Sequence, residues 1–271
     1  MKVTVLVENS TISNKYKKKH GLSLLIESID ESILFDLGQT YLYRQNAEKL
    51  GADLNKVNHV VISHGHIDHI GGLKYLPKNI NTYIQEETLN PFYATLLFGL
   101  KINIGLDNKY KSSKHITLTK DQHKISNKLQ LFSDVEDSSC NTDNQDYLFI
   151  LKDGELQVDD FKHEQHLLIN ENDKNILVVG CAHKGILNII NRAEELIGKE
   201  LDYVIGGFHL KNPLLGPTNN QEDISALGKK LKTKNTIYYT GHCTGKKAYN
   251  ILKSILGGQL HTLSTGKVID I

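Results

Sequence analysis

His64-Gly65-His66-Ile67-Asp68-His69 is the stretch of this sequence that decides the fold, because it gathers three imidazole groups and one carboxylate within six residues. Such ligands suit zinc, iron, manganese or nickel, and no cysteine pair accompanies them as in a closed structural zinc site. Open coordination positions indicate chemistry, since a bound metal lowers the pKa of water from about 15.7 toward about 7. We therefore predict a catalytic metal centre on these three histidines and Asp68.

The residues before and after this stretch predict strands that end at candidate ligands. Residues 57–63 form a buried strand that ends at His64, and three later strands, at 175–179, 203–206 and 236–240, each end in glycine and histidine. Loops at strand ends are held rigidly while their side chains converge. We therefore predict His183 and His242 as further metal ligands. His209, which follows the second of these strands, stays open between ligand, substrate contact and structural residue.

The rest of the chain predicts one α+β domain over residues 1–271. Further strands are expected at 2–7, 22–28, 32–36, 82–84, 147–151 and 166–170, and helices at 41–50, 71–76, 184–196 and 246–256. Residues 90–144 mix Gly, Asn, Lys and Ser and indicate an insertion or lid. Its aromatic residues Phe92, Tyr93 and Phe98 fit core packing better than stacking on a flat ring.

Composition limits the partners and the compartment. Lys and Arg number 32 against 31 Asp and Glu, so the basic excess typical of nucleic-acid binding is missing. No stretch approaches the roughly 18 apolar residues of a membrane span, and residues 1–8 do not form a secretory signal. The three cysteines, Cys140, Cys181 and Cys243, do not suit a disulfide framework. We expect a cytoplasmic protein without nucleic-acid or membrane partners, of unassigned oligomeric state.

The motif resembles the signature of the metallo-β-lactamase superfamily, in which His-x-His-x-Asp-His is followed here by Ile70-Gly71-Gly72. Other stretches resemble one subgroup, which is named for a dihydropterin-ribofuranosylaminobenzene phosphate synthase. They are Leu6-Val7-Glu8-Asn9, His20-Gly21-Leu22-Ser23, Leu34-Phe35-Asp36-Leu37-Gly38, Gly180-Cys181-Ala182-His183, Gly206-Gly207-Phe208-His209-Leu210 and Gly241-His242-Cys243-Thr244-Gly245. The resemblance runs from about residue 3 to residue 271 and is weakest over 90–144.

The resemblance implies an αββα sandwich, with two mixed β-sheets and helices on the outer faces. It also implies one or two divalent metal ions, with zinc as the first choice and iron, manganese or nickel left open. His64 and His66 would bind the first metal, which His183 would complete. Asp68 and His69 would bind the second metal, which His242 would complete.

Two positions near the predicted ligands carry their own expectations. Many superfamily members have a bridging aspartate where Cys181 follows Gly180, so a carboxylate bridge stays open. Cys181 could bind a metal as thiolate or merely line the pocket. Asp36 is either a turn or cap residue or a group that hydrogen-bonds to the free ring nitrogen of a histidine ligand and orients it.

The function predicted from these features is metal-dependent hydrolysis. A metal-bound hydroxide would attack a small-molecule ester, amide or phosphate-type substrate, with phosphate- or pterin-containing molecules among the candidates. Asp68 would double as proton acceptor, and His209 would bind an anionic substrate group or protonate the leaving group. The alternative is a transferase that condenses a dihydropterin diphosphate with a ribofuranosylaminobenzene phosphate. A third class is an iron-dependent redox or ligand-binding protein, against which His66 argues because redox members usually carry glutamate there.

Overall fold

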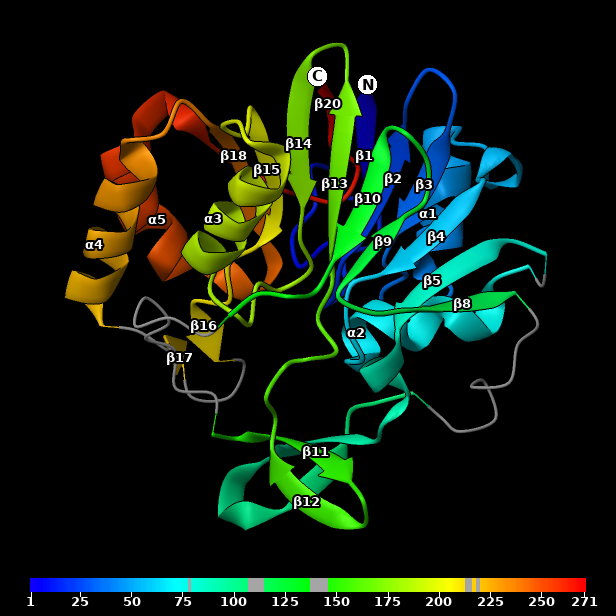
Figure 1. The fold of residues 1–271 in the computed structure, drawn as a ribbon, viewed down its shortest axis with the longest axis vertical. Coiled ribbons are helices and arrows are strands. Elements are labelled where there is room, and N and C mark those ends of the chain that lie inside the picture. Colours follow the sequence, from blue (N-terminus) through cyan, green and yellow to red (C-terminus); the bar gives the residue numbers. More distant parts are fainter. Residues whose placement is uncertain (78, 107–114, 137–145, 213–215, 218–219) are drawn as a thin grey trace. The chain divides into compact units, whose positions relative to one another are not determined.

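The computed structural model describes residues 1–77, 79–106, 115–136, 146–212, 216–217 and 220–271, and these residues belong to two compact units (Figure 1). The first unit comprises Met1–Lys120, Asp146–Gln165 and Ser264–Ile271. The second comprises Asp121–Gln145 and His166–Leu263. A single domain over 1–271 stays a prediction.

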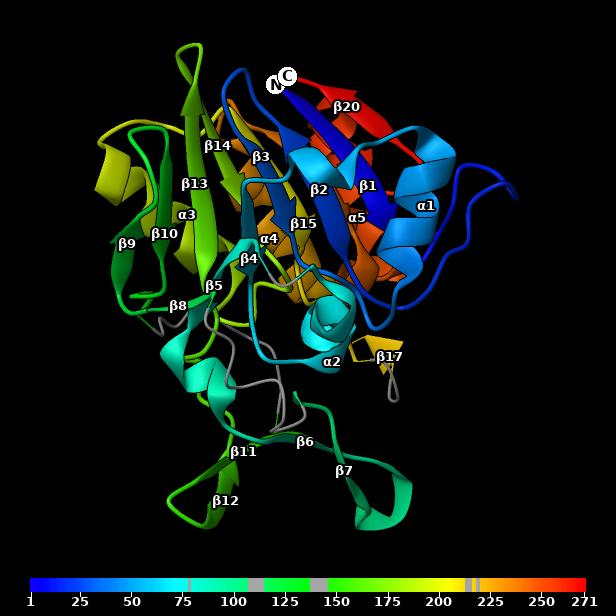
Figure 2. The same cartoon turned by 90° about the vertical axis from the view of Figure 1, so that its right-hand side faces the viewer.

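The first unit is built on a mixed seven-stranded sheet, whose early strands lie side by side in Figure 2. Its order is β20 (Val268–Asp270), β1 (Lys2–Val7), β2 (Ser23–Glu27), β3 (Ser32–Phe35), β4 (His59–Ile62), β5 (Asn81–Gln85) and β8 (Ile116–Thr119). The pairs from β20 to β3 are antiparallel, and those from β3 to β8 are parallel. The carboxyl ends of β3 and β4 therefore meet at one edge of this sheet.

Helix α1 (Leu42–Leu50) packs on this sheet beside β1 (Figure 2). Its Tyr43 and Ala47 are buried in a cluster with strand residues such as Leu6 and Val60. Burial of each large apolar side chain of this kind stabilises the fold by about 1.5–3 kcal/mol. The helix ends at Gly51, whose φ of 69° is the left-handed conformation that glycine adopts without strain. The short helices of the first unit are η1 (Leu54–Lys56), α2 (Ile67–Ile70), η2 (Gly71–Tyr75), η3 (Glu86–Leu89) and η4 (Leu97–Gly99).

A second sheet of the first unit is antiparallel and has four strands. Its order is β12 (Glu155–Val158), β11 (Leu148–Lys152), β6 (Phe92–Thr95) and β7 (Lys101–Asn103). Phe92 is fully buried, as core packing requires. Phe98 is fully exposed, so the expectation of a core position is wrong for this residue. It lies in η4 with a φ of 63°, in the turn between β6 and β7 rather than in a strand.

The second unit is built on its own mixed seven-stranded sheet. The order is β19 (Leu260–Thr262), β18 (Ile237–Gly241), β15 (Tyr203–Gly207), β14 (Lys174–Val178), β13 (His166–Glu171), β10 (Leu129–Phe132) and β9 (Gln122–Lys124). Strands β19, β18, β15 and β14 are parallel, and the remaining pairs are antiparallel. The carboxyl ends of β14, β15 and β18 therefore lie at one edge. A short pair, β16 (Lys211–Asn212) and β17 (Gly216–Pro217), completes the strands of this unit.

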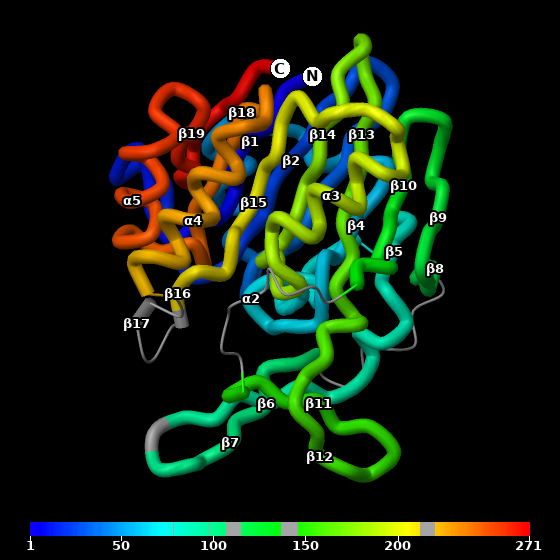
Figure 3. Tube along the Cα trace, turned by 60° about the vertical axis from the view of Figure 1, so that its left-hand side comes forward, coloured from blue at the N-terminus to red at the C-terminus, as the bar shows by residue number. Residues whose placement is uncertain are grey.

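Three helices cover one face of the second sheet, in front of β14, β15 and β18 in Figure 3. They are α3 (Ile186–Ile197), α4 (Gln221–Lys232) and α5 (Lys246–Leu256). Buried side chains such as Ile190 and Leu252 form one core cluster with strand residues. The Asn220 side chain caps α4 by accepting a hydrogen bond of 2.9 Å from the Asp223 N–H. Single turns η6 (His242–Thr244) and η7 (Gly257–Gln259) flank α5.

The α+β class and the mixed character of the sheets are confirmed. The segment 90–144, predicted as an insertion or lid, supplies β6 and β7 to the four-stranded sheet and β8 to the first large sheet. It also supplies β9 and β10 to the second large sheet, so its described strands are part of the sheet layers. Within the described ranges, each helix is too short or too polar to cross a lipid bilayer.

Candidate metal centre

The first unit brings His64, His66, Asp68 and His69 together beyond the end of β4. The ring centroid of His64 lies 4.7 Å from that of His66 and 4.1 Å from that of His69. All three imidazoles are buried, and Asp68 is partly exposed. Asp68 and His69 lie in the helical turn α2, so the motif is a strand end followed by a helical turn rather than a loop throughout. This donor set fits a divalent metal, although the ligand roles themselves stay a prediction.

Burial and nearby carboxylates shift the pKa values of two of these histidines in opposite directions. Burial lowers the pKa of His66, although Asp159 acts against the shift. Burial also acts to lower the pKa of His69, but the carboxylates of Asp36 and Asp68 outweigh it and the pKa is raised. His66 is therefore held neutral, which is the form of imidazole that binds a metal.

Asp36 follows β3 and fixes the orientation of His69. Its Oδ2 lies 2.6 Å from His69 Nδ1, and its Oδ1 accepts the Ser63 N–H at 2.7 Å. The Ser63 hydroxyl donates to Asp36 Oδ2 at 2.7 Å and lies 2.8 Å from His64 Nδ1. The carboxylate holds the His69 proton on Nδ1, which directs the lone pair of Nε2 outward to a metal. The expected contact between Asp36 and a histidine of the motif is confirmed.

We expect Asp36→Asn to weaken zinc binding by about 10- to 100-fold. If the amide oxygen of the substituted side chain still accepts the hydrogen bond from the Ser63 N–H, its NH2 group faces His69 Nδ1. This nitrogen must then act as acceptor, so the ring proton moves to Nε2. That nitrogen then lacks a lone pair for the metal. Competition with a chromogenic zinc chelator measures the change in affinity.

Asp134→Asn is the matched control for this substitution. Asp134 is paired with Arg192 at 2.5 Å in the second unit, so its loss removes a carboxylate without touching His69. Zinc affinity should be unchanged in this control. Equal affinities of both variants and the wild type would contradict the positioning role of Asp36.

Asp159 and His163 also contact the motif, and the sequence does not predict either contact. Gly65 donates its N–H to His163 Nδ1 at 3.0 Å, so the ring proton is on Nε2, which donates to Asp159 Oδ2 at 3.0 Å. The same carboxylate oxygen lies 3.7 Å from His66 Nε2. Burial acts to raise the pKa of Asp159, but His163 and His66 outweigh it and the pKa is lowered. The spacing Asp159-x-x-x-His163 was the available signal, and it lies far from the motif in sequence.

We expect Asp159→Asn to lower the free energy of unfolding of the metal-free protein by about 1–3 kcal/mol. In the native protein the Phe161 N–H donates to Asp159 Oδ1. In the variant, the new amide NH2 would face either the His163 Nε2–H or this Phe161 N–H, so one of the two donors would lose its acceptor. Because the folded pKa of Asp159 is depressed, its contribution is fully present above the unfolded value of about 3.9 and is lost at lower pH. Urea unfolding at pH 7 after chelation measures the difference.

The neighbouring Asp160 provides the control for this measurement. Its carboxylate is partly exposed and pairs with Lys152 and Lys162 at 3.6 and 3.2 Å. Asp160→Asn should change the free energy of unfolding by no more than about 0.5 kcal/mol. If the two variants unfold at the same urea concentration, the buried network is not what stabilises this region.

His20 contacts the motif, and the sequence does not predict this contact. Its Nε2 lies 3.1 Å from Asp68 Oδ2. The turn is close because Gly21 has no side chain: a Cβ there would lie 2.4 Å from the Asp68 carbonyl oxygen. The glycine after His20 was therefore the signal for this close approach.

The second unit gathers its own candidate residues at the ends of β14 and β15. Ligand atoms of Cys181, His183 and His209 lie within 4.8 Å of one another, and all three residues are buried. The ring centroids of His183 and His209 are 4.1 Å apart. His242 follows β18 and is also buried. A ligand set that adds His183 and His242 to the first four residues stays a prediction.

The loops that carry these side chains are conformationally strained. Ala182, His209 and His242 have φ values of 61°, 43° and 49°, in the left-handed region that favours glycine. Each such residue costs of order 1–3 kcal/mol and persists only where the surroundings impose it. The strained residues come after the ends of three parallel strands, as expected for loops that a functional site shapes.

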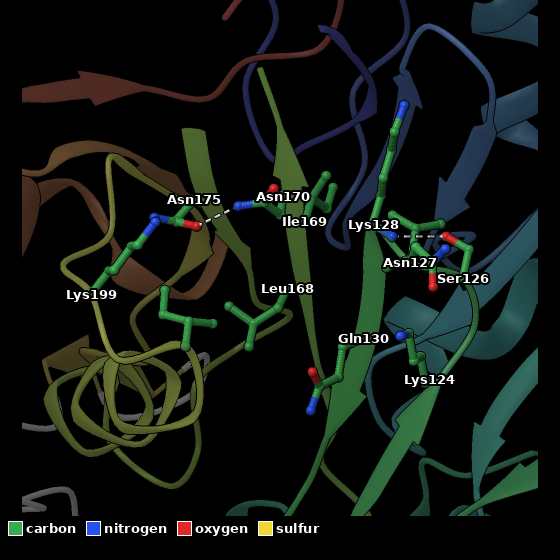
Figure 4. Close-up of a pocket in the computed structure, with 12 residues that line it drawn as sticks. Lys124, Ser126, Asn127, Lys128, Gln130, Leu168, Ile169, Asn170, Asn175 and Lys199 are labelled. Carbon is green, nitrogen blue, oxygen red and sulfur yellow. Dashed lines mark hydrogen bonds between the residues drawn. The ribbon is translucent and has the colours of Figure 1, made fainter. Parts of the chain in front are cut away.

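A cavity of about 230 Å³ in the second unit includes none of the predicted ligands in its lining (Figure 4). Residues of β9, β10, β13 and β14 line it, together with Ile197 at the end of α3 and Lys199 beyond that helix. Asn170 donates to Asn175 Oδ1 at 2.8 Å along its wall. Lys124, Lys128 and Lys199 give the lining a positive charge. This cavity is separate in its residues from the candidate metal centre.

Comparison with known proteins supports the resemblance seen in the sequence. A family profile described as "Metallo-beta-lactamase superfamily" matches residues 17–97, which include the whole motif. A 7,8-dihydropterin-6-methyl-4-(beta-D-ribofuranosyl)-aminobenzene-5'-phosphate synthase of Methanocaldococcus jannaschii is 28% identical over 99% of this chain and 96% of its own length. An uncharacterized protein of the same organism is 29% identical over 93% of this chain and 94% of its own length.

Solved structures share the fold. A crystal structure described as a metal-dependent hydrolase of the beta-lactamase superfamily has a TM-score of 0.87 and 27% identity, covering 100% of this chain and 99% of its own. An isothiocyanate hydrolase from Delia radicum gut bacteria has a TM-score of 0.58 and 15% identity, covering 100% and 99%. The second likeness concerns the fold alone.

Proposed function

Because this chain belongs to the metallo-β-lactamase superfamily and has its fold, we propose that it is a metal-dependent hydrolase of a small-molecule ester, amide or phosphate-type substrate. The observation that carries the proposal is the convergence of three buried imidazoles and the Asp68 carboxylate beyond β4. Asp36 and Asp159 hold that donor set in place.

The proposed metal ligands are His64, His66, Asp68 and His69 of the first unit with His183 and His242 of the second. Nitrogen and carboxylate donors make zinc the first choice, with iron, manganese or nickel as alternatives. A divalent ion bound by such residues activates water near neutral pH and stabilises developing negative charge.

The side chains supply the proton transfers and the substrate contacts. The Asp68 carboxylate accepts a proton from the attacking water, and His20, 3.1 Å away, holds that carboxylate in position. His209, buried at the end of β15, binds a phosphate or carboxylate of the substrate or protonates the leaving group. We place the enzyme in the cytoplasm, where its thiols stay reduced, with a small molecule rather than nucleic acid as its partner.

The second candidate function is a transferase that condenses a dihydropterin diphosphate with a ribofuranosylaminobenzene phosphate. The observation in its favour is the similarity to the archaeal synthase, which is 28% identical over nearly the full length of both chains. A metal ion held by the same residues would then stabilise a diphosphate leaving group instead of activating water.

Incubation of the zinc-loaded protein with a dihydropterin diphosphate, with and without the aminobenzene acceptor, separates the two functions. A hydrolase releases diphosphate at the same rate without acceptor, whereas a transferase requires the acceptor and forms the condensed product. Esters, lactones and phosphodiesters in parallel reactions define the substrate class. Chelator-treated protein is the control, and activity that survives chelation would refute a metal-dependent reaction. Oxygen consumption with a flavoprotein reductant would instead identify a redox enzyme.

A further inference from the structure

Two cysteines of the second unit lie at the same sheet edge as its histidines. Cys181 follows β14, and Cys243 follows His242 at the end of β18, the two strands on either side of β15. The sulfur atoms and a ring nitrogen of His242 lie within 4.8 Å of one another. Both thiols are buried, and neither belongs to a disulfide.

The backbone around Cys243 makes room for its sulfur atom and directs a donor toward it. A Cβ on Gly207 would lie 2.4 Å from Cys243 Sγ, so the glycine leaves the space that the sulfur needs. The His209 N–H donates to the same sulfur at 3.3 Å. The Cys243 thiol in turn donates to the Cys181 carbonyl oxygen at 3.5 Å, which joins the two cysteines of the cluster.

The loop that carries Cys243 is fixed from both sides. The Thr244 hydroxyl accepts the Phe208 N–H at 3.0 Å and lies 2.6 Å from the Thr240 hydroxyl, which in turn donates to the Gly206 carbonyl at 2.8 Å. These contacts join the ends of β15 and β18 and set the position of η6. The sulfur position is thus imposed by the surrounding fold.

The three donors lie close enough together to bind one tetrahedral metal ion. Zinc–sulfur bonds of about 2.3 Å place two thiolates about 3.8 Å apart around one ion. Donor atoms already within 4.8 Å reach that spacing by small side-chain rotations. A buried thiol pair that served only to fill space would need neither the adjacent histidine nor the left-handed φ of 49° at His242.

We propose that Cys181, His242 and Cys243 bind one metal ion through two sulfur atoms and one nitrogen. The inference rests on the proposed metal-dependent function and narrows the choice of metal ion for that function. Two thiolates select zinc, cobalt(II) or iron(II) over magnesium, calcium and manganese, which prefer oxygen ligands. Cys243 thereby becomes a ligand in addition to the histidines and Asp68.

Cobalt(II) loading of the full-length protein tests the assignment, because cobalt bound to thiolates absorbs in the near ultraviolet by sulfur-to-metal charge transfer. We expect this absorption in the wild type, a decrease of about half in Cys243→Ser, and its loss in the Cys181→Ser, Cys243→Ser double variant. Cys140→Ser, at a position outside the described residues, leaves both proposed sulfur ligands in the chain and is the control, for which we expect the full absorption. Cys243→Ala is measured alongside, with circular dichroism to confirm folding of each variant.

X-ray absorption of the zinc-loaded wild type provides a readout that needs no variant. Two sulfur neighbours at about 2.3 Å support the site. Zinc bound with only nitrogen and oxygen neighbours overturns the sulfur site but leaves the proposed hydrolase intact. A charge-transfer band that is unchanged in both Cys243 variants also overturns it. A protein that binds neither cobalt nor zinc refutes the sulfur site and the metal-dependent function together.

Discussion

The purified His64→Ala, His66→Ala double variant should contain no more than about half of the wild-type metal and turn over substrate roughly 10³-fold more slowly or worse. The two imidazoles lie 4.7 Å apart and are buried, so alanine removes two nitrogen donors from a space that water cannot fill with comparable ligands. Elemental analysis of protein purified without added metal measures the loss directly. The single variant His242→Ala, analysed in the same way, tests the contribution of the second unit.

His59→Ala is the control for the loss of an imidazole. His59 is on β4, the strand that precedes the motif, but it contacts Glu31 at 3.6 Å and Tyr83 rather than the motif. Its metal content should equal that of the wild type. Full metal retention in both the His64, His66 variant and the His242 variant would refute the ligand assignment.

Gly72→Ala should destabilise the metal-free protein by about 3 kcal/mol or more, the largest stability effect that we expect from one methyl group. A Cβ at this position would lie 2.3 Å from the Leu37 carbonyl oxygen and 2.7 Å from the Leu37 Cβ. The Gly72 N–H also donates to the Gly38 carbonyl at 2.8 Å, which prevents the turn from moving away. Because Leu37 follows Asp36, the same displacement should also weaken zinc binding.

Thermal unfolding after chelation measures this effect, and about 3 kcal/mol corresponds to a decrease in Tm of roughly 6–12 °C for a chain of this size. Gly258→Ala is the control, because a Cβ there meets no atom within 4 Å and the residue does not have a left-handed φ. Its Tm should be unchanged. If both variants unfold at the wild-type temperature, the close packing of η2 on Leu37 does not limit stability.

The sequence was sufficient to predict those elements whose signal is local. Helix α5 has the predicted bounds, Lys246–Leu256, because its apolar positions recur at helical spacing between two glycines. The strands that end at His64, His183, His209 and His242 were predicted from apolar runs followed by glycine. Parallel pairing then places the loops of each sheet at one edge.

Contacts between residues far apart in sequence could not be predicted in the same way. Asp159 reaches His66 only because β11 and β12 return the chain to the motif, and nothing near His66 in the sequence specifies that return. His20 depends on the missing Cβ of Gly21, and Cys243 on that of Gly207. In each case the deciding quantity is the space left by a glycine or the path of a distant hairpin, and neither produces a periodic pattern.

The left-handed residues after the strands of the second unit have an evolutionary consequence. Ala182 has a φ of 61° and no side-chain group that could bind or react, so glycine would relieve its strain. An alanine in such a conformation persists only while some requirement outweighs the gain in stability. A descendant of this chain released from selection at its strand ends should therefore acquire glycine at 182, 209 and 242.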